Sequence, residues 1–198
     1  MRTAIFLAAS LAAVSAHASW GDCTNTAPRS AALPAAGVTR VVVVGRAGSL
    51  KVVGHAGAAE VRATGTACAS SKSELAEIQL RATRSGGEIR IEAEVPEVSM
   101  SMWGERRLDF EVSLPANVPV KVVDGSGELT VEHTAALEVD DGSGSLTIRH
   151  VAGNLDVHDG SGAVDVTDVG GDFLVESKGS GHVSYERIKG KVDVPRRR

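Results

Sequence analysis

Three aspartates recur at the same place in the C-terminal half of the chain and are its first candidates for chemistry. Asp124, Asp141 and Asp159 each open an Asp-Gly-Ser-Gly stretch, and Lys178 opens a fourth copy, Lys-Gly-Ser-Gly. If the copies stack, neighbouring carboxylates repel by about 1 kcal/mol even in water, and a cation such as Ca²⁺ would relieve this. We favour the simpler interpretation, in which Asp-Gly makes the turn, the side chain accepts backbone N–H bonds, and Lys178 caps the column.

A second recurring position carries His133, His150, Asp168 and Arg187, two residues after an apolar pair in each copy. Two imidazoles and a carboxylate are residue types that bind Zn²⁺. A linear row is a poor tetrahedral cage, however, and this column should face solvent at a corner. Ordinary polar surface residues explain it as well, so we predict no bound metal and no other cofactor.

The sequence contains no recognisable catalytic constellation. Serines are prominent in the Gly-Ser-Gly turns, where their small size explains them, and there is no G-x-S-x-G, H-E-x-x-H or phosphate-loop motif. Polysaccharide-cleaving β-helices exist, but no dedicated carboxylate pair is visible. We expect a protein that is not an enzyme, with an enzyme acting on envelope polysaccharide as a remaining alternative.

These positions belong to a repeat that extends to Val194. The four turns start at positions 124, 141, 159 and 178, so the spacings are 17, 18 and 19 residues. Each copy has two apolar pairs that alternate with polar residues: Leu129/Val131, Leu146/Ile148, Val164/Val166 and Val183/Tyr185, then Leu137/Val139, Leu155/Val157, Phe173/Val175 and Val192/Val194. Alternation with period two predicts short strands with one buried face, and one unit cannot bury these faces alone. We therefore predict an all-β fold, a parallel, single-stranded β-helix-like solenoid.

An inserted segment interrupts this pattern. The stretch GSLKVVGHAGAAEVRATGT from Gly48 aligns without gaps on GSLTIRHVAGNLDVHDGSG from Gly144, so one divergent repeat precedes the insertion. Between the two, the sequence predicts longer, antiparallel strands at Ile78 to Thr83, Ile89 to Val95 and Leu108 to Leu114. Ser85-Gly86-Gly87 suits a hairpin turn between the first two. The segment Met100 to Trp103 has no assignable role.

The N-terminus has the pattern of a secretory signal. Arg2 precedes an apolar run from Ala4 to Val14, and Ala16-His17-Ala18 is a cleavage site. We therefore divide the chain into a signal peptide (1–18), an N-terminal extension with Cys23 (19–37), an N-terminal β region (38–119), the repeats (120–194) and a basic tail (195–198). No apolar stretch is long enough for a transmembrane segment. We expect export to the periplasm, the cell surface or the extracellular space.

In an exported chain the two cysteines, Cys23 and Cys68, predict one disulfide. Lipidation of Cys23 is the alternative, although the preceding Trp20-Gly21-Asp22 does not resemble a lipobox. A net charge of −4 and an aromatic content of 3% argue against a nucleic-acid partner.

The repeated DGSG-x-Φ-x-Φ units, where Φ is apolar, and the phrase Leu114-Pro115-Ala116-Asn117-Val118-Pro119-Val120 resemble a bacterial putative-adhesin family of exported β-strand-repeat proteins. The resemblance covers the chain from about Val38, implies a β-helix-like solenoid at the envelope, and carries over no catalytic residue. The partner we expect is an unidentified envelope protein or glycan, and edge pairing could join two copies into a homo-oligomer. A periplasmic module that binds a small ligand or a metal is the alternative.

Overall fold

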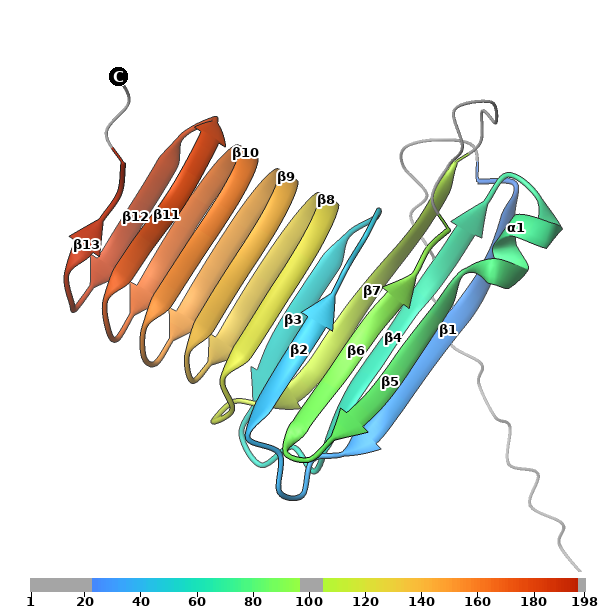
Figure 1. The fold of residues 1–198 in the computed structure, drawn as a ribbon, viewed down its shortest axis with the longest axis horizontal. Coiled ribbons are helices and arrows are strands. Elements are labelled where there is room, and N and C mark those ends of the chain that lie inside the picture. Colours follow the sequence, from blue (N-terminus) through green and yellow to red (C-terminus); the bar gives the residue numbers. More distant parts are fainter. Residues whose placement is uncertain (1–22, 97–104, 196–198) are drawn as a thin grey trace, which may run out of the picture.

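The computed structural model describes residues 23–96 and 105–195, and within these ranges the protein is all-β, which confirms the predicted class. Thirteen strands form one mixed sheet, accompanied by one short helix (Figure 1). The strands are β1 (Asn25–Pro34), β2 (Arg40–Val44), β3 (Leu50–His55), β4 (Glu60–Ala69), β5 (Gln79–Ser85), β6 (Glu88–Glu94), β7 (Arg106–Pro115), β8 (Val120–Thr134), β9 (Leu137–Val151), β10 (Leu155–Val169), β11 (Phe173–Ser180), β12 (Val183–Ile188) and β13 (Val192–Asp193); the helix is α1 (Lys72–Glu77). The expected signal peptide and the segment Met100 to Trp103 lie outside the described residues.

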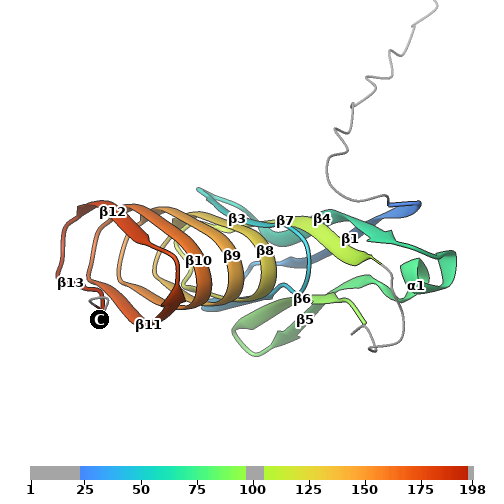
Figure 2. The same ribbon diagram turned by 90° about the horizontal axis from the view of Figure 1, so that it is seen from above.

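Strands β8, β9 and β10 are successive turns of a flattened coil (Figures 1 and 2). They pair in parallel, and β10 continues the pairing to β11 with its first half and to β12 with its second half. The four Gly-Ser-Gly bends therefore line up at one corner, with Ser126, Ser143, Ser161 and Ser180 in one row. Each strand bends at this corner, so its two halves lie on opposite faces of the coil.

Strands β2 and β3 form the turn that precedes β8 in space, although the inserted segment separates them from β8 in sequence. β2 pairs in parallel with the first half of β8, and β3 with the second half. Ala47, at the bend between β2 and β3, bridges to Ser126. The first half of the divergent copy, β3, thus lies directly against the first of the later copies. The expectation that the whole copy forms a coil is wrong for its second half, which lies in β4 and pairs antiparallel with β1 and β7.

Antiparallel pairing involves the inserted segment and two strands that precede it, β1 and β4. β5 and β6 form a hairpin around Gly86-Gly87, and β4 pairs antiparallel with β7 and with β1. The three strands expected from the sequence correspond to β5, β6 and β7. Two elements are not predicted by the sequence pattern, the helix α1 and the strand β1 in the N-terminal extension. The inward residues of β1, among them Ala27 and Ala31, carry little apolar signal.

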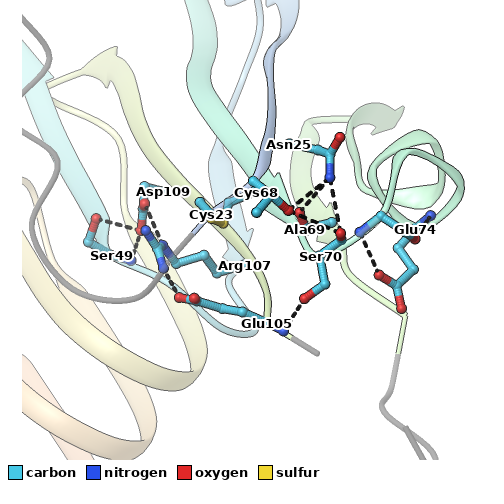
Figure 3. The surroundings of a disulfide bond; sticks show 12 residues. Cys23, Asn25, Ser49, Cys68, Ala69, Ser70, Glu74, Glu105, Arg107 and Asp109 are labelled. Atoms are coloured by element: carbon cyan, nitrogen blue, oxygen red, sulfur yellow. Dashed lines mark hydrogen bonds and ion pairs between the residues drawn. A yellow bond between two sulfur atoms is a disulfide. The ribbon is translucent and has the colours of Figure 1, made fainter. Parts of the chain in front are cut away.

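Side chains from both faces close the N-terminal end of the sheet. Arg29 on β1 donates to the carbonyl oxygens of Ile78 (2.5 Å) and Leu75 (2.7 Å), and Arg84 on β5 donates to the carbonyl oxygens of Pro34 (3.0 Å) and Ala36 (2.7 Å). A disulfide joins Cys23 to Cys68 beside β1 and β4 (Figure 3). The arginine hydrogen bonds tie strands of the two faces together where the stack of coils ends, and the disulfide fastens the start of β1 to its neighbour β4.

The core consists of columns of Val, Leu and Ile that continue from coil to coil. Leu129, Leu146 and Val164, for example, form one column and are each fully buried. Burial of one such side chain stabilises the fold by roughly 1.5–3 kcal/mol. At the last coil the columns emerge, leaving Tyr185 47% and Val192 38% exposed. Within the described ranges, no helix is long and apolar enough to cross a membrane.

Candidate functional site

The recurring aspartates form a buried column inside the Gly-Ser-Gly corner. Asp124, Asp141 and Asp159 lie in register on β8, β9 and β10, with Lys178 next to them on β11. The aspartates are only 5%, 2% and 1% exposed. Neighbouring strands are about 4.8 Å apart, so three carboxylates share a narrow space that water does not reach. We call these four residues the aspartate column.

Only one end of the aspartate column has a counter-charge. The Lys178 ammonium pairs with Asp159 Oδ2 and also donates to the carbonyl oxygens of Gly162 (2.8 Å) and Ser180 (2.5 Å). Both carboxylate oxygens of Asp141, Oδ2 of Asp124 and Oδ1 of Asp159 are buried without a hydrogen-bond partner. The turn role expected from the sequence therefore accounts for the corner but not for Asp141, because its side chain accepts no backbone N–H.

Burial shifts the protonation of two of these carboxyls. Removal from water raises the pKa of Asp124 to about 6, against a smaller opposing effect of the Gly125 N–H. Burial, together with the negative charges of Asp124 and Asp159, raises the pKa of Asp141 to about 7. Both carboxyls can thus carry protons near neutral pH, where an ordinary aspartate is ionised.

Glycines hold the corners of adjacent coils close enough to make this column. Gly127, Gly144 and Gly162 have φ values of 134°, 136° and 142°, a region that side chains other than hydrogen rarely allow. A Cβ at Gly144 would lie 1.7 Å from the carbonyl oxygen of Gly127. On the β2 side the column ends at Gly45, where a Cβ would lie 2.0 Å from Asp124 Oδ1. The glycines of the repeat therefore allow backbone contact as well as turning.

The second column lies at the other corner of each coil, and its side chains satisfy one another. The rings of His133 and His150 stack with centroids 4.6 Å apart and planes inclined by 10°, His150 Nδ1 lies 3.2 Å from Asp168 Oδ2, and Arg187 pairs with Asp168. The hydrogen bond from Arg187 lowers the pKa of Asp168. The imidazoles are parallel and exposed, so they do not converge on a common point as tetrahedral ligation requires.

All four residues of this second column have left-handed backbone, with φ between 55° and 61°. The pattern of residue types did not predict this backbone conformation. The residue of the divergent repeat that aligns with His150, Gly54, does not have positive φ, so the repeat carried no signal for this conformation. Their turn geometry therefore accounts for the recurring position without a ligand.

A group of three side chains with donor atoms in mutual reach consists of Cys23, Cys68 and Glu105. The two sulfurs form the disulfide, so they are not metal ligands (Figure 3). Glu105 and Ser70 join β7 to β4 nearby, where the Glu105 N–H donates to Ser70 Oγ at 2.8 Å. The arrangement at this end is structural.

The outer face made by the first halves of β8, β9 and β10 and by β11 carries an acidic cleft of about 170 Å³, which the sequence pattern did not predict. Its charged residues are Lys121, Glu138, Asp140, Asp156, His158 and Glu176. Burial and, after it, the charges of Glu176 and Glu138 raise the pKa of Asp156. Glu138 is neutralised by Lys121 (2.5 Å) and Arg40 (3.1 Å). At about 170 Å³ the cleft is smaller than the roughly 300–1,000 Å³ that is typical of small-molecule sites.

Comparison with known proteins gives structural neighbours but no family. No family model matches the chain, and no curated protein matches it. A putative cell adhesion protein from Clostridium sporogenes is 15% identical, and the match covers 85% of this chain and 98% of that one, with a TM-score of 0.41. A putative adhesin from Bacteroides fragilis is 8% identical over 86% and 97% of the two chains, with a TM-score of 0.36. Both names fall in the class that the sequence resembles, and at these scores they carry no further argument.

Proposed function

We propose that the chain is an exported, non-enzymatic β-repeat protein of the cell envelope, adhesin-like or scaffold-like, which binds a protein or glycan through one face of a parallel β-solenoid. The observation that carries this proposal is a row of polar side chains that crosses eight adjacent strands. From β1 to β12 the row consists of Ser30, Thr64, Glu111, Lys51, Thr130, Thr147, Asp165 and Ser184. We call it the polar row.

The polar row is suited to binding an extended partner. None of its eight residues is buried, and it lies on the outer side of the second halves of β8, β9 and β10. At about 4.8 Å per strand, the row is roughly 34 Å long. It presents hydroxyls, carboxylates and one ammonium, which pair with the hydroxyl and amide groups of a glycan or a protein surface.

The rest of the chain supports this role over catalysis. The aspartate column is shut away from any substrate, and the exposed histidine column is occupied by its own side-chain pairs. The parallel β-solenoid is supported by the in-register parallel pairing of β8 with β9, β9 with β10 and β10 with β12. The disulfide supports export, because such bonds are typical of proteins in oxidising compartments.

Cosedimentation with cell-envelope fractions tests the proposal. Residues 19–198 are purified, and the double variant Thr130→Arg/Thr147→Arg places two large side chains on the polar row without touching the core. We expect envelope binding to fall at least tenfold. A glycan array and chemical crosslinking then separate a glycan partner from a protein partner.

Asp140→Arg is the matched control, because it makes the same change of two charge units on the opposite face, where Asp140 is exposed. It should bind the envelope like the unaltered protein. Equal loss in both variants, or no binding by the unaltered protein, would contradict the proposal, as would turnover of an envelope polysaccharide.

Association of two copies stays a prediction. Among the described strands β12 pairs only with β10; its own Tyr185 is exposed, and so is Val192 on the terminal strand β13. Unpaired strand edges of this kind can pair with another chain. Light scattering after size-exclusion chromatography, with Tyr185→Ser as the comparison, measures whether this edge joins two molecules.

A further inference from the structure

We infer that the aspartate column is a proton-binding site, which holds two protons between its carboxylates and makes the contact between the coils of β8, β9 and β10 dependent on pH. The inference is independent of any partner of the polar row. It starts from a count of charge. Three carboxylates and one ammonium, Lys178, share a buried space, so two negative charges are left without a counter-charge when all the groups are ionised.

Among residues 23–96 and 105–195, no other charged group faces the column. On the β2 side the neighbouring position is Gly45, which has no side chain, and the side chain of Arg46 is 55% exposed and lies 3.8 Å from Glu92 instead. On the β11 side the neighbour is Lys178, which already pairs with Asp159. Two further charges must therefore be neutralised by something that enters the column from solution.

A proton fits this space better than a metal ion does. Asp124, Asp141 and Asp159 lie in a line along the coil axis, whereas Ca²⁺ requires six to eight oxygens around one point. A protonated carboxyl can instead donate its O–H to the carboxylate on the next strand. Two such protons supply donors for buried oxygens that have no partner, notably both oxygens of Asp141.

The direction of the pH effect follows from the raised pKa values of Asp124, about 6, and Asp141, about 7. In the unfolded chain both groups titrate near 3.9. Between these limits the folded state binds more protons than the unfolded state, so stability falls as the pH rises. The stabilisation is complete below about pH 4 and is lost as the pH passes through 6 and 7. The stack of coils is therefore held most firmly in mild acid.

Urea unfolding between pH 5 and pH 8, followed by circular dichroism, tests this inference. Each proton released on unfolding changes the unfolding constant tenfold per pH unit. We expect the constant of the unaltered protein to rise about 100- to 1000-fold over this range. Asp141→Asn, a neutral substitute for the protonated carboxyl, should reduce the rise to about tenfold and should make the protein more stable than the unaltered one at pH 8.

Asp140→Asn is the matched control, since Asp140 precedes Asp141 in the sequence but is exposed. Its pH dependence should equal that of the unaltered protein. Carboxyl ¹³C NMR of the unaltered protein counts the protons directly, even if a variant fails to fold, and should show two aspartates that titrate above pH 5.5.

Three results would overturn the inference. The first is that every aspartate titrates below pH 5 in the NMR experiment. The second is that the pH dependence of unfolding is the same in Asp141→Asn as in the unaltered protein. The third is that CaCl₂ at pH 8 raises the melting temperature of the unaltered protein but not of Asp141→Asn, because the column would then hold a metal ion.

Discussion

The Lys178 ammonium and the Asp159 carboxylate form an ion pair inside the protein, with side chains 9% and 0% exposed. The pair joins β10 to β11 at the point where the repeat replaces aspartate by lysine. A fourth aspartate here would add one more negative charge to a buried column and remove its positive charge. The single departure from the Asp-Gly-Ser-Gly pattern therefore compensates for the three copies that keep it.

Replacing Lys178 by methionine should destabilise the fold strongly. Met fills a similar volume but leaves the Asp159 carboxylate buried without a counter-charge, and breaking a buried pair in this way costs about 3–5 kcal/mol. Urea unfolding at pH 7 measures the loss. The double variant Lys178→Met/Asp159→Asn should recover most of it, because the stranded charge is gone. A loss below 1 kcal/mol in the single variant would show that the pair is not shielded from water.

Replacing Gly144 by alanine should weaken the stack at its corner. The new Cβ would meet the Gly127 carbonyl oxygen at 1.7 Å, and φ at this residue is 136°. We expect a loss of at least 3 kcal/mol, since the backbone of two coils must move apart. Gly57→Ala is the control, because φ there is also positive, 73°, but nothing lies within 4 Å of the new Cβ. Similar losses of stability in the two variants would mean that the positive φ, and not the close approach of the Gly127 carbonyl oxygen, causes the loss.

Replacing Thr134 by valine should stabilise the protein. Thr134 is 1% exposed and its hydroxyl has no hydrogen-bond partner, whereas Val151, Val169 and Ile188 occupy the same position in the later coils. Removing an unsatisfied buried hydroxyl at nearly constant volume should add about 1 kcal/mol. Thermal unfolding measures the gain, with Thr130→Val on the outer side of the same strand as a control that should change little. A destabilised Thr134→Val would indicate that the hydroxyl has a partner.

Reducing the disulfide between Cys23 and Cys68 should lower the melting temperature. The bond closes a loop with a sequence separation of 45 residues, and the chain-entropy model assigns roughly 4 kcal/mol to a loop of this length. Calorimetry with and without reductant, and with Cys23→Ser/Cys68→Ser, measures the contribution. The double serine variant should not respond to reductant, and a chain that unfolds identically with and without the bond would contradict the prediction.

The sequence by itself determined the strands of the repeat and their order. The spacing of the Gly-Ser-Gly turns and the alternation at residues such as Leu129 and Val131 depend on short-range geometry, so they could be read directly. The hairpin of β5 and β6 was equally local, because Ser85-Gly86-Gly87 marks its turn. The alignment of Gly48 with Gly144 likewise placed β3 in the same kind of coil, but it wrongly extended the copy into β4, whose antiparallel partners β1 and β7 are distant in sequence.

Only the tertiary structure decided which way the polar residues of the corners point and which side chains and backbone groups they contact. The sequence showed Asp124, Asp141 and Asp159 as equivalent turn residues. Their burial, and the two excess charges of the column, depend on contacts between residues that are 17 to 19 positions apart. The strand β1 depends in the same way on a partner, β4, which lies more than 25 residues later in the chain. Burial and charge balance are properties of neighbours in space, and a repeat identifies those neighbours without showing whether water remains between them.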